Sequence, residues 1–147
     1  MTHETVEILL VEDNPADLEL TLRVLKKSHL ANAIRVARDG EEALDMLFCR
    51  GPFAGKDVGL PKVVLLDLKL PKVDGLEVLA ALRDDVRTAL LPVVILTSSK
   101  EQEDVIRSYE LHVNSFIQKP VDFGQFQETV RQLGLYWLVV NVPPVSR

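Results

Sequence analysis

Near its start the chain carries the stretch Ile8-Leu9-Leu10-Val11-Glu12-Asp13-Asn14-Pro15. Four consecutive apolar residues are typical of a strand that is buried on both faces, because a half-exposed strand alternates apolar and polar residues. Asn followed by Pro favours a helix start, since Asn caps free backbone N–H groups and Pro fits the first helical position. The stretch therefore predicts a buried strand, an acidic turn and a helix in immediate succession.

The same pattern is repeated along the chain. Further strands are predicted at Val63–Leu66, Val93–Leu96 and, more weakly, Ser115–Ile117, and an alternating edge strand is predicted at Ala33–Ala37. Helical patterns follow Asn14 and Asp39-Gly40, and others cover 75–84, 101–111 and 122–138. Five strands alternating with five helices predict an α/β fold, a doubly wound five-stranded parallel sheet in the order 2-1-3-4-5 with helices on both faces, as in flavodoxin-like proteins.

Composition and charge narrow the classes of function. The 147 residues are enough for one domain, which we expect over 6–138, between a segment 1–5 and a tail 139–147 that is too short for an effector domain. Seventeen Lys and Arg against 22 Asp and Glu, without a basic cluster, argue against nucleic-acid binding. A lone cysteine, Cys49, no signal-like start and no long apolar run predict a cytoplasmic protein without membrane contact.

Reactive side chains follow the predicted strands at their carboxyl ends. Glu12 and Asp13 follow the first strand, Asp67 the third, Thr97 the fourth and Lys119 the fifth. Each has a structural explanation on its own, but in this sheet order the first and third strands are neighbours, so the three carboxylates should converge. They would repel one another unless a cation lay among them, and Mg²⁺ suits carboxylate oxygens. The lysine charge and the threonine hydroxyl would then favour a phosphate group.

These residues resemble the receiver domain of two-component response regulators over roughly residues 5–138. The motifs that carry the resemblance are Leu9-Leu10-Val11-Glu12-Asp13-Asn14, Leu65-Leu66-Asp67-Leu68-Lys69-Leu70-Pro71 with Asp74-Gly75, Pro92-Val93-Val94-Ile95-Leu96-Thr97-Ser98, and Phe116-Ile117-Gln118-Lys119-Pro120. The resemblance implies that Asp67 accepts a phosphoryl group from a sensor histidine kinase. It also implies that Glu12, Asp13, Asp67 and the backbone carbonyl of Lys69 bind Mg²⁺, with Mn²⁺ as a possible substitute.

The resemblance assigns roles to the remaining motif residues. Thr97 would hydrogen-bond the bound phosphoryl group, Lys119 would pair with it, and the bond from Lys119 to Pro120 is expected to be cis. Thr97 and Phe116 occupy the switch positions, but Phe116 replaces a tyrosine that is frequent there, so the hydroxyl of the usual switch is missing. The signal would then act on a protein-interaction surface of the receiver itself.

A narrower likeness is to single-domain regulators that are paired with bacterial phytochromes. It rests on the loop 50–61, the string Ser108-Tyr109-Glu110-Leu111-His112-Val113-Asn114 and the ending Tyr136-Trp137-Leu138. The sensor kinase is therefore expected to be a bacterial phytochrome. Apolar residues beyond the stripe of the last helix predict a homodimer through that helix and the tail, with the interface residues Tyr136, Leu138, Val139 and Val140.

Alternatives from other classes remain at this point. A phosphoaspartyl-type phosphohydrolase acting on small phosphate esters would need a second acid two residues after its nucleophile, and Lys69 stands there. A flavodoxin-like FMN carrier would need a Gly-, Ser- or Thr-rich phosphate loop where this chain has Glu12 and Asp13. A receiver-like module without phosphorylation would not need the complete set of acids. The residues therefore favour the phosphoacceptor over these three.

Overall fold

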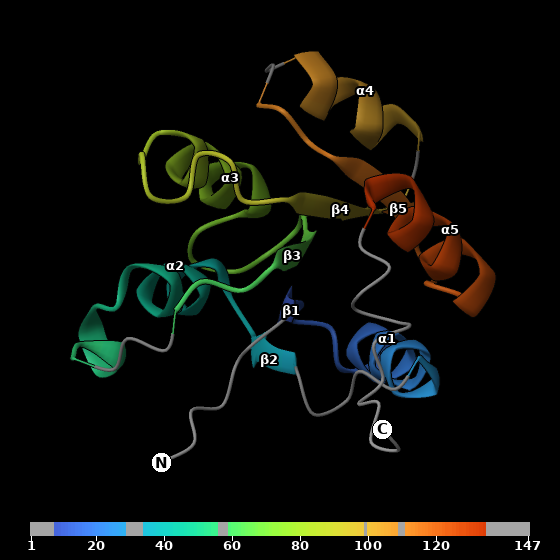
Figure 1. Cartoon of the computed structure of the whole chain (residues 1–147), viewed down its shortest axis with the longest axis horizontal. Helices are drawn as coiled ribbons and strands as arrows, with labels where there is room; N and C mark the ends of the chain where they lie inside the picture. Colours follow the sequence, from blue (N-terminus) through green and yellow to red (C-terminus); the bar gives the residue numbers. More distant parts are fainter. Residues whose placement is uncertain (1–7, 29–33, 56–58, 99, 109–110, 135–147) are drawn as a thin grey trace, which may run out of the picture.

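One parallel sheet organises the computed structural model, which describes residues 8–28, 34–55, 59–98, 100–108 and 111–134 (Figure 1). The strands lie in the order β2-β1-β3-β4-β5, which confirms the predicted fold and sheet order. Their bounds are β1 (Ile8–Val11), β2 (Ile34–Ala37), β3 (Val63–Asp67), β4 (Val93–Thr97) and β5 (Ser115–Gln118).

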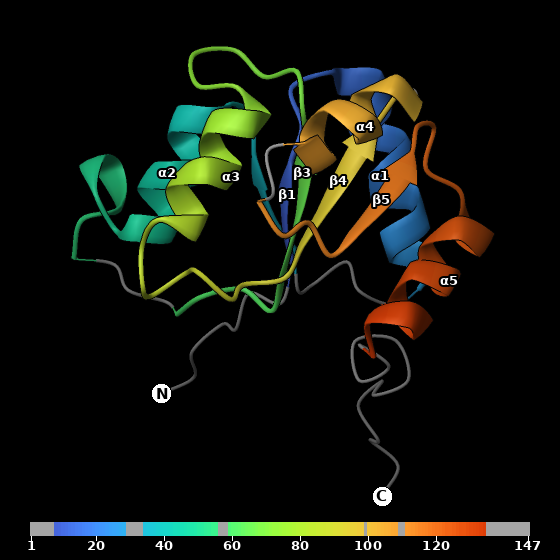
Figure 2. The same cartoon turned by 90° about the horizontal axis from the view of Figure 1, so that it is seen from above.

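Helices cover both faces of this sheet (Figure 2). They are α1 (Pro15–Lys27), α2 (Gly40–Phe48), α3 (Gly75–Arg83), α4 (Lys100–Ser108) and α5 (Phe123–Leu133), with a short 3₁₀ helix η2 (Gly51–Phe53). Helices α1 and α5 cover one face, and α2, α3 and α4 cover the other. Among the described helices, none has the length and hydropathy needed to cross a bilayer.

Strand β1 shows why its apolar run is continuous. Ile8 and Leu10 pack in the core under α1 and α5, whereas Leu9 and Val11 pack in the core under α2, α3 and α4. All four side chains are buried, as expected for the centre of a parallel sheet. In the register with β3, Val11 lies opposite Leu66, so the acids that follow both strands leave the sheet at the same edge.

The loop from β3 to α3 is held by local hydrogen bonds and by close packing. Asp74 caps α3 by accepting the N–H of Glu77 at 3.0 Å, and the Glu77 carboxylate accepts the N–H of Asp74 at 3.2 Å. A Cβ on Gly75 would lie 2.3 Å from the carbonyl oxygen of Asp67, so only glycine fits there without a shift. The start of α3 is therefore packed directly against the end of β3.

A single guanidinium joins the two loops that precede β4 and β5, at the amino ends of these strands. Arg83, at the end of α3, donates hydrogen bonds to the carbonyls of Ala89, Leu91, Leu111 and His112 and to Asn114 Oδ1. Burial lowers the pKa of Arg83. The side chain thus links the loop before β4 to the loop before β5.

Two helices end earlier than the sequence predicts. Helix α4 ends at Ser108, and Leu111, whose carbonyl accepts from Arg83 at 2.8 Å, is not helical. Helix α5 ends at Leu133 because Gly134 adopts a left-handed conformation and its N–H bonds to the last helical carbonyls. The predicted continuation to residue 138, and the interface residues Tyr136, Leu138, Val139 and Val140, lie outside the described residues.

Candidate functional site

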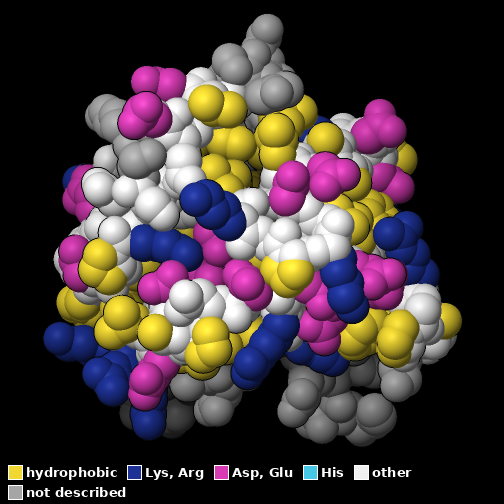
Figure 3. All heavy atoms as spheres, turned by 180° about the vertical axis from the view of Figure 1, so that it is seen from behind, with side chains coloured by type: hydrophobic (Ala, Val, Ile, Leu, Met, Phe, Trp, Pro, Cys, Tyr) yellow, Lys and Arg dark blue, Asp and Glu magenta, His cyan; other side chains and the backbone are white. Residues whose placement is uncertain are grey.

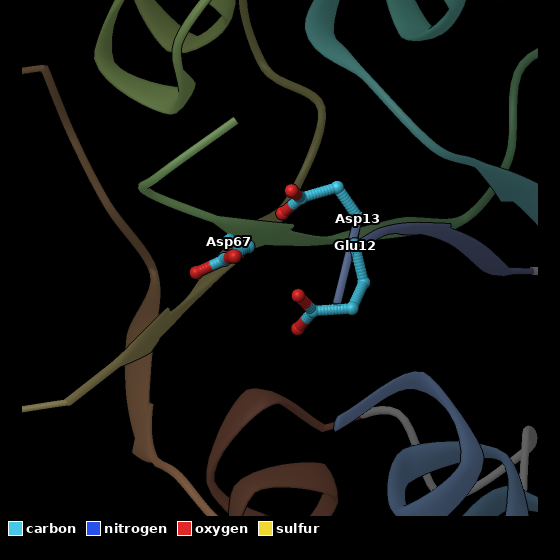
Figure 4. Close-up of side chains that lie close together, drawn as sticks. All are labelled: Glu12, Asp13 and Asp67. Atoms are coloured by element: carbon cyan, nitrogen blue, oxygen red, sulfur yellow. The ribbon is translucent and has the colours of Figure 1, made fainter. Parts of the chain in front are cut away.

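Three carboxylates converge at the carboxyl ends of β1 and β3 (Figure 4). Glu12 and Asp13 follow β1, and Asp67 ends β3. One oxygen from each lies within 4.8 Å of the other two. Glu12 is fully buried, Asp67 exposes only 6% of its surface, and Asp13 is exposed. The site is therefore buried at Glu12 and Asp67 and open to solvent at Asp13.

The environment of Glu12 disfavours a negative charge. Burial is the main cause that raises the pKa of Glu12 to about 7, and the charge of Asp67 is the second. The charge of Lys119 and a hydrogen bond from the Asn14 N–H at 3.2 Å lower this pKa but do not outweigh them. Its Oε1 is buried and has no hydrogen-bond partner among the described residues. Lys119 Nζ forms an ion pair with this oxygen at 3.1 Å and donates its hydrogen bond to Oε2 of the same carboxylate at 3.5 Å. A cation at the carboxylates would relieve this unfavourable burial.

Lys119 brings the one ammonium group of the described site. Its Nζ lies 2.9 Å from Asp17 Oδ2 and 3.2 Å from Asp67 Oδ1, in addition to its approach to Glu12. Burial lowers the pKa of Lys119, but the hydrogen bond with Asp17 and the charges of Asp67 and Glu12 outweigh burial and raise it. The ammonium is therefore charged at neutral pH, and it lies against the carboxyl groups of Glu12, Asp17 and Asp67.

Sequence reasoning did not assign Asp17 to this site. Asp17 stands in the first turn of α1, and that helix begins directly after the acidic turn that follows β1. A helix that starts at the carboxyl edge of the sheet brings its first turn close to the site. This position in the chain is the signal that could have identified Asp17.

Thr97 presents a hydroxyl without a partner. It ends β4, is fully buried, and its Oγ1 has no hydrogen bond among the described residues. Its carbonyl accepts the Lys119 N–H at 2.7 Å, which joins the ends of β4 and β5. A buried hydroxyl without a partner is unfavourable, and an incoming acceptor such as a phosphoryl oxygen would satisfy it.

The other predicted residues lie around this centre. Phe116 of β5 is half-buried, and the Arg107 guanidinium of α4 lies 4.5 Å from the centre of its ring. The Lys119–Pro120 peptide bond is cis. The exposed Lys69 stands two residues after Asp67, and a ligand role for its carbonyl stays a prediction.

The donor set fits a hard divalent cation. Carboxylate oxygens are the ligands that Mg²⁺ and Mn²⁺ prefer, and three of them are close together with only one ammonium beside them. Figure 3 shows acidic and basic side chains gathered near the centre of this face. Chemically, the site combines a cluster of carboxylates that could hold a cation, a fixed positive charge and a buried hydroxyl group.

Comparisons with known proteins agree with this chemistry. The family model "Response regulator receiver domain" matches residues 8–131. The bacteriophytochrome response regulator RtBRR is 52% identical, with a TM-score of 0.87 over 95% of this chain and 84% of its own. The corresponding regulator AtBRR is 57% identical, with a TM-score of 0.84 over 91% and 96%. Response regulator Rcp1 of Synechocystis sp. is 40% identical over 95% of this chain and 93% of its own, and a Mn²⁺-bound form of Rcp1 aligns with a TM-score of 0.71.

Proposed function

Because the chain belongs to the response regulator receiver domain family, we propose that it is a single-domain response regulator whose phosphoacceptor is Asp67. The observation that carries the proposal is the position of the Asp67 carboxylate. This carboxylate lies beside Glu12 and Asp13, two acids that can bind a cation, and 3.2 Å from the Lys119 ammonium. Asp67 ends β3, and the neighbouring strand β4 ends with Thr97, whose hydroxyl is buried. The comparisons do not support the phosphohydrolase alternative.

The proposed reaction transfers one phosphoryl group to Asp67. A carboxylate oxygen attacks the phosphorus of a phosphohistidine on the sensor kinase, the P–O bond forms, and the P–N bond breaks as the imidazole takes up a proton. Lys119 is placed to pair with the oxygens of the transferred group, and the Thr97 hydroxyl is placed to donate to one of them. The chain would catalyse only this reaction and the hydrolysis of its own aspartyl phosphate.

Mg²⁺ is the proposed cofactor, with Mn²⁺ as a substitute. The ligands would be Glu12, Asp13, Asp67 and the backbone carbonyl of Lys69, and the close approach of the three carboxylates supports the first three. Neutralisation of phosphoryl charge is the chemistry that this ion supplies when it is bound. The Mn²⁺-bound form of Rcp1, a protein similar to this chain, supports the binding of a divalent ion.

Thr97 and Phe116 are the proposed switch residues. Phosphorylation adds nearly two negative charges, and the Thr97 hydroxyl would turn toward them. Phe116 has no hydroxyl that could follow, so the change would reach α4 and β5 through packing of the ring, on which Arg107 is stacked. The output is therefore a shift in a pre-existing equilibrium of this surface.

A bacterial phytochrome is the proposed sensor kinase, and a homodimer is the proposed assembly. The identities of 52% and 57% to two bacteriophytochrome response regulators support the first. The apolar residues Tyr136, Leu138, Val139 and Val140 support the second. A chain that ends at Gly134 should sediment as a monomer and the full chain as a dimer, and a dimer of the shortened chain would contradict the interface. The cytoplasmic location and the domain bounds 6–138 stay predictions.

Intact mass spectrometry after incubation with Mg²⁺ and acetyl phosphate tests the phosphoacceptor. We expect one adduct of about 80 Da, the mass of one phosphoryl group. Asp67→Asn should abolish it, and a chelator should prevent it. Asp74→Asn is the matched control, because asparagine still caps α3 and the substituted carboxylate lies outside the acidic cluster. Normal labelling of Asp67→Asn would show that the nucleophile is assigned wrongly.

A further inference from the structure

A groove of about 270 Å³ lies between α3 and α4, outside the acidic site. Its apolar lining is formed by Leu68, which follows β3, by Leu76 at the start of α3, and by Val105 and Ile106 of α4. Ile106 is part of the core and forms the floor, whereas Val105 leaves 54% of its surface exposed. In Figure 3 this groove is the hollow in the upper half of the view, where hydrophobic side chains gather.

The rim of the groove is acidic. Asp74 stands on the α3 side and Glu101 on the α4 side, and both are exposed. Neither forms an ion pair within the part of the chain that the structure describes. The nearest arginine of α4, Arg107, pairs with Glu103 and stacks on Phe116, so its charge is engaged on β5. An apolar floor therefore lies between two acidic side chains that have no ion-pair partner on the described residues.

The size of the groove indicates what could occupy it. Small-molecule sites usually enclose about 300–1,000 Å³, whereas this groove is open and slightly smaller than that range, which suits one or two side chains of a protein. Its floor is apolar and its two sides are helices, which is the arrangement that receives the apolar face of an amphipathic helix. The charge of the rim selects Lys and Arg on either side of the apolar anchor.

We propose that this groove binds a basic amphipathic helix of another protein, with a bulky apolar side chain inserted between Leu76 and Val105 and Lys or Arg residues beside Asp74 and Glu101. The proposal does not require phosphorylation of Asp67, and it concerns a surface that none of the proposed site residues lines. The surface is nevertheless continuous with the site along the chain, because Leu68 directly follows Asp67.

The test is a selection from a displayed library of short helical peptides in which one face is randomised, carried out on the full chain. We expect enrichment of peptides with an apolar anchor flanked by Lys or Arg. Val105→Glu should weaken their binding about tenfold or more, and Glu101→Lys should weaken it several-fold and reduce its dependence on salt. Val86→Glu is the matched control, because Val86 is 96% exposed and lies outside the groove, so binding should be unchanged.

Amide shifts of the labelled chain locate the bound peptide. Shifts at Leu76 and Val105, together with weaker binding by both groove variants, support the proposal. Circular dichroism checks that Val105→Glu is folded, and the exposed Glu101→Lys provides a second variant if it is not. The proposal is wrong if no peptide is enriched, if enriched peptides carry acidic or uncharged flanks, if Val105→Glu binds them normally, or if the shifts lie elsewhere.

Discussion

Binding of a divalent metal should depend on pH through one buried carboxyl group. Glu12 is fully buried at the centre of the acidic cluster, and burial together with Asp67 raises its pKa to about 7. A metal ion binds the carboxylate and not the acid, so it must displace the proton that Glu12 holds below this pH. Affinity for the metal should therefore fall as the pH is lowered.

The magnitude follows from the same value. With a pKa of about 7 in the metal-free chain, the apparent dissociation constant rises by a factor of about 1.1 at pH 8 and about 11 at pH 6. We therefore expect about tenfold weaker binding of Mg²⁺ or Mn²⁺ at pH 6 than at pH 8. At pH 6, about 0.9 proton should be released for each metal ion bound.

Titration calorimetry in two buffers of different ionisation enthalpy measures both quantities. Glu12→Gln should bind metal more weakly at every pH but lose most of the difference between pH 6 and pH 8. Glu19→Gln is the matched control, because Glu19 is exposed on α1 and outside the cluster, and it should keep the full difference. Equal affinity at both pH values, or unchanged proton release in Glu12→Gln, would refute the assignment.

The same group makes a contribution of opposite sign to the stability of the metal-free chain. Because the folded pKa of Glu12 lies above the unfolded value of 4.5, folding favours the protonated form, and this stability is lost as pH rises through about 7. The loss amounts to at most about 3 kcal/mol, from 1.36 kcal/mol for each pH unit of the difference. Urea unfolding at pH 5 and pH 8 should show it, and it should be absent in Glu12→Gln.

Two further predictions concern the framework around the site. Gly75→Ala places a Cβ 2.3 Å from the Asp67 carbonyl oxygen, so it should lower the free energy of unfolding by about 3 kcal/mol and slow phosphorylation. Chemical denaturation and the mass assay measure these two effects. Gly124→Ala is the control and should be tolerated in both, because its Cβ meets nothing closer than 3.5 Å. Arg83→Ala removes a guanidinium that links two loops and should lower the free energy of unfolding by about 2 to 4 kcal/mol. In the same denaturation experiment, Arg23→Ala on the surface of α1 should change it by less than about 0.5 kcal/mol. Equal effects of the two substitutions would contradict the role of Arg83.

Local sequence patterns were sufficient for the sheet and for most of the site. Continuous apolar runs can be satisfied only where both faces of a strand are covered, so they indicated the central strands. The acids that follow β1 and β3 meet because neighbouring parallel strands end at one edge. Helix ends were less predictable: α4 ends at Ser108, and the Leu111 carbonyl beyond it binds Arg83, a contact between residues that are far apart in the chain.

The sequence by itself determined the order of the strands, the carboxylates at their ends and the family to which the chain belongs, since these depend on residue types and their spacing. Only the tertiary structure decided how those residues behave together. It places Asp17 against Lys119, buries Glu12 so that its pKa rises, and leaves the Thr97 hydroxyl without a hydrogen-bond partner in the part of the chain that the structure describes. It also opens the groove between α3 and α4. Burial and charge are set by neighbours that are distant in sequence, and no local pattern specifies them.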